Sequence, residues 1–238
     1  MHSGSAFSVA AQPPGRRVAL MLVQGALVMG LLGAVLFGAA GTLDWPRAWR
    51  LLGVYALGYA VSTSLLFLRV PELVDERRKP HPGVKPWDRR LVQAYQAMYF
   101  PTFAVSGLDW RFGWSAVPAS VSLVALAAII VFFALITWAP LVNPHLETYV
   151  RIQTERGHSV IDRGPYRIIR HPTYAALALF FLAVPLALGS WWGLAPGGIA
   201  AGLVVARTAL EDRTLRAELP GYDAYARRVR YRLLPGAW

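Results

Sequence analysis

Long runs of apolar residues alternate with shorter charged segments along this chain of 238 residues. Each long run predicts a helix, because about 20 apolar residues in helical form cross the roughly 30 Å hydrocarbon core of a bilayer. Gly189 and Ser190 alone separate the last two runs, so we expect a tight helical hairpin there whose helices need not span independently. The predicted helices cover residues 18–41, 48–68, 91–108, 116–139, 173–188 and 191–208.

The pattern therefore predicts an all-α integral membrane bundle with five or six transmembrane helices and a cytoplasmic helical tail at the C-terminus. A hydrophobic content of 55% and a charged content of 16% agree with a membrane protein. Three regions are expected: a loose N-terminal tail at 1–17, four transmembrane helices within 18–139, and a C-terminal region, 140–238, that contains the hairpin and the tail.

The formal net charge of +11 is distributed unevenly between the two sides of the predicted membrane. Arg and Lys gather before the first helix, in the 69–90 loop, in the 140–172 segment and after residue 207. The positive-inside rule places these segments and both termini in the cytoplasm, and we expect the membrane to be a bacterial inner membrane. The basic charge then indicates contact with membrane lipids, and we expect no nucleic-acid partner.

The 140–172 segment is unusually long for a connection in a helical bundle, which marks it as a candidate functional loop. It ends in "GPYRIIRHPTYAALALFF", where a basic turn runs into an apolar helix that Pro172 would begin. A helix start carries partial positive charge, so a carboxylate or phosphate would be stabilised there. The alternative is that Arg163, Arg167 and Arg170 only hold the loop to the lipid headgroups.

Arg207 and Glu211 lie four residues apart, on one face of the last apolar helix. An ionisable pair at the end of a membrane helix is a candidate site, and a simple ion pair within the helix is the alternative. The chain has no cysteine, which excludes disulfides, thiolate nucleophiles and Cys-ligated zinc, and we expect no metal.

"VRIQTERGHSVI", "GPYRIIRHPTY", "RTALED" and "LPGYDAYARRVRYRLLP" together resemble the isoprenylcysteine carboxyl methyltransferase family and the related phospholipid methyltransferases. The resemblance implies that region 140–238 is a cofactor-binding methyltransferase region with a pocket for S-adenosylmethionine. It places Arg207 and Glu211 near the methyl acceptor. Ala176 and Asp212 depart from the family, which usually has Gly and a second Glu there. The implied cofactor-binding residues are Gln153, His158, Val160, Gly164, Tyr166, Arg170, His171, Pro172 and Tyr174.

The expected function is methyl transfer to a small or lipid-like acceptor at the cytoplasmic face. A carboxylate acceptor would need only Arg207 for orientation, whereas an amine or thiol would need Glu211 as a base. Membrane sterol reductases carry a similar C-terminal pattern, so an NADPH-dependent reductase is one alternative. A non-enzymatic membrane scaffold or small transporter is the other.

Overall fold

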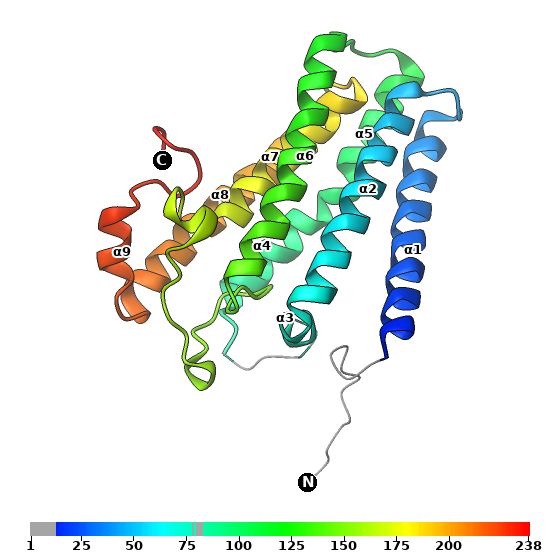
Figure 1. Ribbon diagram of the computed structural model, residues 1–238. Coiled ribbons are helices and arrows are strands. Elements are labelled where there is room, and N and C mark those ends of the chain that lie inside the picture. The colour runs from blue at the N-terminus through cyan, green and yellow to red at the C-terminus, as the bar shows by residue number, and fades with distance from the viewer. Residues whose placement is uncertain (1–12, 78, 80–82) are drawn as a thin grey trace.

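The computed structural model describes residues 13–77, 79 and 83–238, and the regular structure of these residues is helical (Figure 1). Within them, 4 helices are long and apolar enough to cross a membrane, and a shorter apolar helix, α7, accompanies them. The predicted fold class, a helical membrane bundle, is confirmed. The long helices are α1 (Pro14–Ala40), α2 (Pro46–Arg69), α6 (Ala119–Val142) and α8 (Leu194–Glu218), and the shorter one is α7 (Pro172–Leu188).

The prediction of one helix over residues 91–108 is wrong, because that segment is divided between α4 (Pro86–Ala97) and α5 (Tyr99–Phe112). Pro101 explains the break. Proline has no N–H to donate to the carbonyl four residues earlier, at Ala97, and its ring would collide with that carbonyl. The chain therefore turns at Met98 and starts a new helix.

The first helix begins earlier than predicted. Residues 14–17, expected in the loose tail, form the first turn of α1, while residues 1–12 of that tail lie outside the described residues. Helices α1 to α4 and α7 all begin at proline, whose missing N–H costs nothing at a first helical position. The helical turn at α3 (Pro71–Glu76) gives the 69–90 loop a short ordered start.

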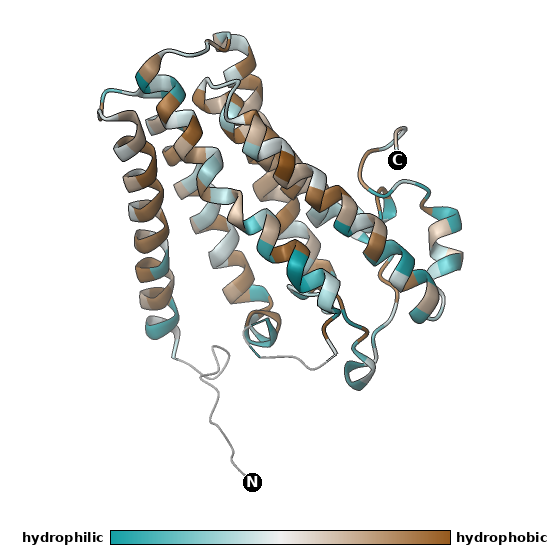
Figure 2. Ribbon diagram, turned by 180° about the vertical axis from the view of Figure 1, so that it is seen from behind, coloured by the Kyte–Doolittle hydropathy of each residue, from teal (hydrophilic) through white to brown (hydrophobic). Residues whose placement is uncertain are grey.

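Helix α7 is the centre of the bundle and packs against α6 on one side and α8 on the other (Figure 1). Phe180 and Val184 of α7 are buried with Ile129 of α6 and Val204 of α8. The hairpin predicted for α7 and α8 is present, and Gly197 allows the close approach, since a Cβ there would lie 2.3 Å from the Phe181 carbonyl oxygen. Hydrophobic residues, in brown, predominate along the long helices, and hydrophilic residues, in teal, gather toward the end that carries α3, the loop after α6 and α9 (Figure 2).

That polar end is built from the long loop after α6, two 3₁₀ turns, η1 (Thr154–Arg156) and η2 (Gly164–Arg167), and α9 (Tyr222–Arg228). The chain after α9 folds back over the start of α7. The Arg170 amide donates to the Tyr231 carbonyl at 2.9 Å, and the His171 amide donates to the Arg232 carbonyl at 3.0 Å. Loop and tail thus enclose the point where α7 begins.

Candidate active site

A pocket opens where the loop after α6 meets the first turn of α7, the last turns of α8, and α9. Its empty space, open solvent at the mouth included, is about 780 Å³. Of the predicted site residues, the lining includes Gln153, His158, Val160, Tyr166, Arg170, His171, Pro172, Tyr174 and Glu211.

Glu211 is the carboxylate that reaches this pocket from α8. Its side chain is 19% exposed, accepts a hydrogen bond from the Tyr174 hydroxyl, and has Oε1 4.0 Å from Nδ1 of His171. The His171 and Tyr174 rings stack with centroids 5.7 Å apart, because one helical turn brings both to the same side of α7. The start of α7 therefore presents an imidazole, a phenol and a carboxylate to one space.

Gln153 and His158 form the loop wall of the pocket. The Gln153 side chain donates to the His145 carbonyl at 2.6 Å and accepts from Nη1 of Arg156 at 2.7 Å, so both ends of the buried amide are held. The His158 ring lies 4.7 Å from the His145 ring. Burial, with further contributions that include the neighbouring His145, lowers the pKa of His158 to about 4. His158 is therefore neutral at physiological pH.

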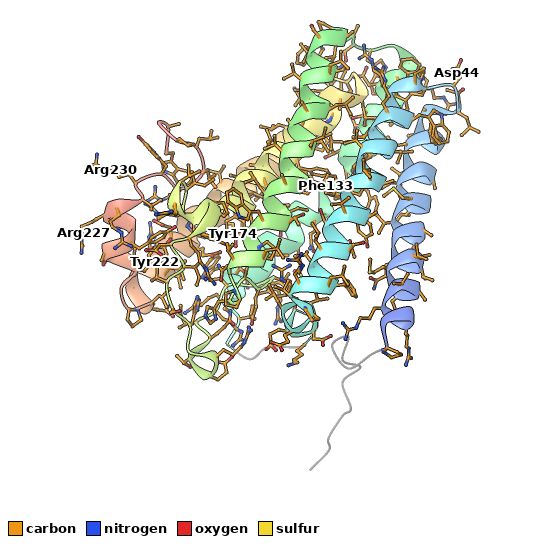
Figure 3. The ribbon with its side chains drawn as sticks, viewed as in Figure 1. Asp44, Phe133, Tyr174, Tyr222, Arg227 and Arg230 are labelled. Carbon is orange, nitrogen blue, oxygen red and sulfur yellow. The ribbon has the colours of Figure 1, made fainter. Side chains whose placement is uncertain are left out.

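Tyrosines make up much of the remaining wall. Tyr166 of η2 accepts from the Asn143 side chain at 3.0 Å, and burial raises its pKa to about 12. The Tyr225 hydroxyl donates to the Tyr166 carbonyl at 2.8 Å, which ties α9 to η2. Tyr222 lies on the same side of the molecule as Tyr174 (Figure 3). Aromatic faces beside the Glu211 carboxylate suit a ligand with a positive charge.

Arg170 reaches the pocket wall, but its guanidinium is held by protein groups. Nε donates to Oδ1 of Asp212 at 2.7 Å, Nη2 donates to Oδ2 at 3.1 Å, and Nη1 donates to the Val229 and Arg230 carbonyls at 2.8 and 2.9 Å. Asp212 also accepts from Tyr222 at 3.0 Å and Arg232 at 3.0 Å. The pair joins the segment just before α7 to α8 and the tail, so Asp212 has a clear structural role in this chain.

Arg207 and Glu211 share one face of α8 without forming an ion pair with each other. Arg207 is 3% exposed and binds Asp88 of α4 through two bonds, Nε to Oδ1 at 2.6 Å and Nη2 to Oδ2 at 3.1 Å. Nη2 also donates to the Thr148 carbonyl at 2.7 Å, and Cζ lies 4.8 Å from the Tyr174 ring centroid. Arg207 therefore lies behind Tyr174, outside the pocket lining.

Gly164 also lies outside the lining, at the start of η2. Its φ of +58° is in the left-handed region, and a Cβ would lie 3.2 Å from Nε1 of Trp138 and from Cγ2 of Val142. The glycine lets the loop turn closely against α6. Pro172, in contrast, lies in the pocket wall as the first residue of α7.

Two residues central to the site were missed by sequence reasoning. The buried face of α4 carries Asp88, Val92 and Tyr95 at helical spacing. A carboxylate on an otherwise apolar helix face was therefore the sequence signal that could have identified Asp88. Its partner, 119 residues away, had no local signal. Tyr222 lies within the motif "LPGYDAYARRVRYRLLP", and nothing local in that motif indicates that its hydroxyl meets Asp212.

Residues 120–217 match the family model for phospholipid methyltransferases. The match covers nearly all of α6, the loop, α7 and most of α8, and so it contains every predicted site residue. The resemblance to this family group is confirmed, although the motif in the tail after residue 217 lies outside the matched segment. A comparison with curated proteins gives no match. Fold and matched segment together indicate an integral membrane protein that contains a segment similar to the phospholipid methyltransferases.

Proposed function

We propose that the chain is an S-adenosylmethionine-dependent methyltransferase and that its cofactor binds in the pocket between the loop, α7 and α9. The observation that carries the proposal is the convergence of Gln153, His171 and Tyr174 with the carboxylate of Glu211 on one space. When bound, the cofactor supplies a methyl group on a positively charged sulfur. The tyrosine faces and Glu211 provide the aromatic and negative surroundings that stabilise such a cation.

The residues predicted to bind the cofactor fit this ligand to different degrees. Gln153 and Tyr166 are buried, fixed by hydrogen bonds and aligned along the pocket wall, which suits recognition of a polar nucleoside. Arg170 fits less directly, because Asp212 neutralises its charge. Its contribution to binding is then to hold the wall in shape. His158 remains the neutral polar group on the loop side.

Glu211 is the residue best placed to act on the acceptor. It is partly exposed in the pocket, and no arginine neutralises it at salt-bridge distance among the described residues. A carboxylate in this position accepts a proton from an amine or thiol acceptor as the new bond to carbon forms. Arg207, predicted to orient a carboxylate acceptor, would do so only after leaving Asp88. The geometry thus supports a proton-bearing acceptor better than a carboxylate.

The location supports an acceptor from the membrane. The pocket lies at the polar end of helices that can cross a bilayer, and we place this end in the cytoplasm because the basic loops gather there. A lipid-like acceptor could approach from the bilayer while the cofactor arrives from water. Enclosure by loop and tail would then exclude water from the reacting groups.

The test supplies methyl-labelled S-adenosylmethionine to membranes that contain the protein and identifies the labelled product class. Glu211→Gln should lower turnover about a hundredfold or more, in line with general base catalysis, and change cofactor affinity little. Glu218→Gln, in the same helix but exposed and paired with Lys85, is the matched control and should retain activity. Equal turnover of wild type and Glu211→Gln would refute the assigned role, and an absence of labelled product would refute the function.

A further inference from the structure

A second hollow lies on the other side of the Val142–Pro144 segment from the cofactor pocket. It is formed where α2 ends and α3 begins, next to the last turn of α6 and the loop. Its empty space, open solvent included, is about 680 Å³. Three arginines from three separate parts of the chain, Arg69, Arg156 and Arg163, line it, and we call it the arginine hollow.

Two guanidinium groups of the arginine hollow, those of Arg69 and Arg163, keep donors available for a ligand. Arg163 uses Nε for the Val142 carbonyl at 3.3 Å, and no partner of its terminal nitrogens is found within the described residues. The Arg69 side chain likewise has no hydrogen-bond or ion-pair partner among the residues that the structure describes. Arg156 is engaged by protein groups, because Nη1 donates to Gln153 at 2.7 Å and lies 3.5 Å from Oε1 of Glu147, and Nη2 donates to the Pro144 carbonyl at 3.1 Å. Glu72 is the one carboxylate among the lining residues, and Glu147 pairs with Arg156 from outside them, so Arg69 and Arg163 leave the hollow with a positive charge.

The position of the arginine hollow favours a lipid as its ligand. Helices α2 and α6 are both long and apolar enough to cross a membrane, and both end at the hollow. Lipid phosphates begin where the hydrocarbon core ends. Leu68, 73% exposed beside Arg69, and Trp138, 46% exposed one turn before Val142, offer apolar and interfacial surface for the rest of a lipid.

We propose that the arginine hollow binds the phosphate of an anionic phospholipid. A guanidinium presents paired N–H donors that match phosphate oxygens, and basic pockets between transmembrane helices on the cytoplasmic side bind anionic headgroups. The site is separate from the proposed methyltransferase chemistry, and the lipid proposal does not depend on the cofactor assignment. Inorganic phosphate shares the recognised chemistry and is the alternative source of the anion.

The test measures lipid retained by the purified full-length protein, using native mass spectrometry with phosphatidylglycerol or phosphatidylcholine added to the detergent. Wild type should retain phosphatidylglycerol preferentially. Arg69→Gln/Arg163→Gln should lose roughly tenfold or more in that retention, since each arginine near the surface contributes to anionic lipid binding. The matched control is Arg227→Gln/Arg230→Gln, whose side chains point away from the bundle (Figure 3) and which should retain lipid like wild type.

Two outcomes would overturn the proposal: equal retention of both lipids by wild type, or equal loss of phosphatidylglycerol in the two arginine variants. The second result would mean that net charge alone attracts the lipid. Titration with inorganic phosphate separates the sources. Displacement of phosphatidylglycerol by millimolar phosphate supports a site for the free anion, and retention supports a site that needs the lipid.

Discussion

Asp88 of α4 and Arg207 of α8 form a buried, two-bonded ion pair, and the Val150 amide donates to the same carboxylate at 2.8 Å. The pair thereby fixes the loop wall of the proposed cofactor pocket to two helices. Asp88 is fully buried, so its charge depends on Arg207 for compensation. This contact explains why an interfacial arginine predicted to meet substrate lies instead behind Tyr174.

Replacing Asp88 by Asn should destabilise the protein by about 3–5 kcal/mol, because the charge of Arg207 would remain buried without a partner. Chemical unfolding in detergent measures the change, with Asp44→Asn as the control at an exposed position at the other end of the bundle (Figure 3). The double variant Asp88→Asn/Arg207→Met should recover part of the loss. Unfolding of Asp88→Asn at wild-type denaturant concentration would contradict the role of the pair.

Asp212→Asn should loosen the C-terminal tail, because Asp212 binds both Arg170, just before α7, and Arg232 of the tail. Trypsin should then cleave the 227–232 segment about tenfold faster or more, as local opening becomes easier. Mass spectrometry of the fragments over time measures this rate. Asp223→Asn removes an exposed carboxylate that also binds Arg216, and its cleavage rate should stay near that of wild type. Equal rates for both variants would show that Asp212 does not anchor the tail.

The lowered pKa of His158 predicts a loss of stability in acid. His158 is neutral in the folded protein down to about pH 4, whereas an unfolded histidine takes up a proton near pH 6.5. Proton binding by the unfolded state therefore lowers stability progressively from about pH 6.5 to pH 4. His158→Gln should show a smaller fall in thermal midpoint than wild type over this window. Parallel curves for the two proteins would mean that His158 titrates normally.

Gly164→Ala should cost roughly 1–2 kcal/mol from the left-handed backbone alone. The added Cβ would also press on Trp138 and Val142, so the cost should exceed that value. Gly202→Ala is the matched control, since a Cβ there meets nothing within 4 Å and alanine favours the helix. Thermal unfolding of both variants in detergent distinguishes them. A neutral effect at Gly164 would show that the turn relaxes without strain.

Much of the fold could be predicted from apolar periodicity, because burial in lipid demands long apolar helices and leaves a strong local signal. The hairpin at Gly189 and the helix start at Pro172 were predictable for the same reason, because each has a signal in its own local sequence. Pro101 also indicates a helix break in the sequence, but the apolar run on both sides of this proline suggested one continuous helix. The length of the apolar segment alone therefore predicts one helix where the chain forms two, α4 and α5.

The site was predictable only in part, for a different reason. Gln153, His171 and Glu211 belong to local motifs, and the structure brings them to one pocket. The pairing of charges is a long-range property: Arg207 meets Asp88 and Arg170 meets Asp212, both across large separations in sequence. Composition and spacing identify charged residues, whereas tertiary packing decides which are neutralised and which remain free to act on a ligand.

Calorimetric titration with S-adenosylhomocysteine tests most directly whether the pocket beside the start of α7 binds the methyl donor, as we propose. Wild type in detergent should bind, Gln153→Ala should bind about tenfold more weakly or worse, and Gln93→Ala, at an exposed position of α4, should bind like wild type. An absence of binding heat for wild type, or equal affinity of wild type and Gln153→Ala, would contradict the account.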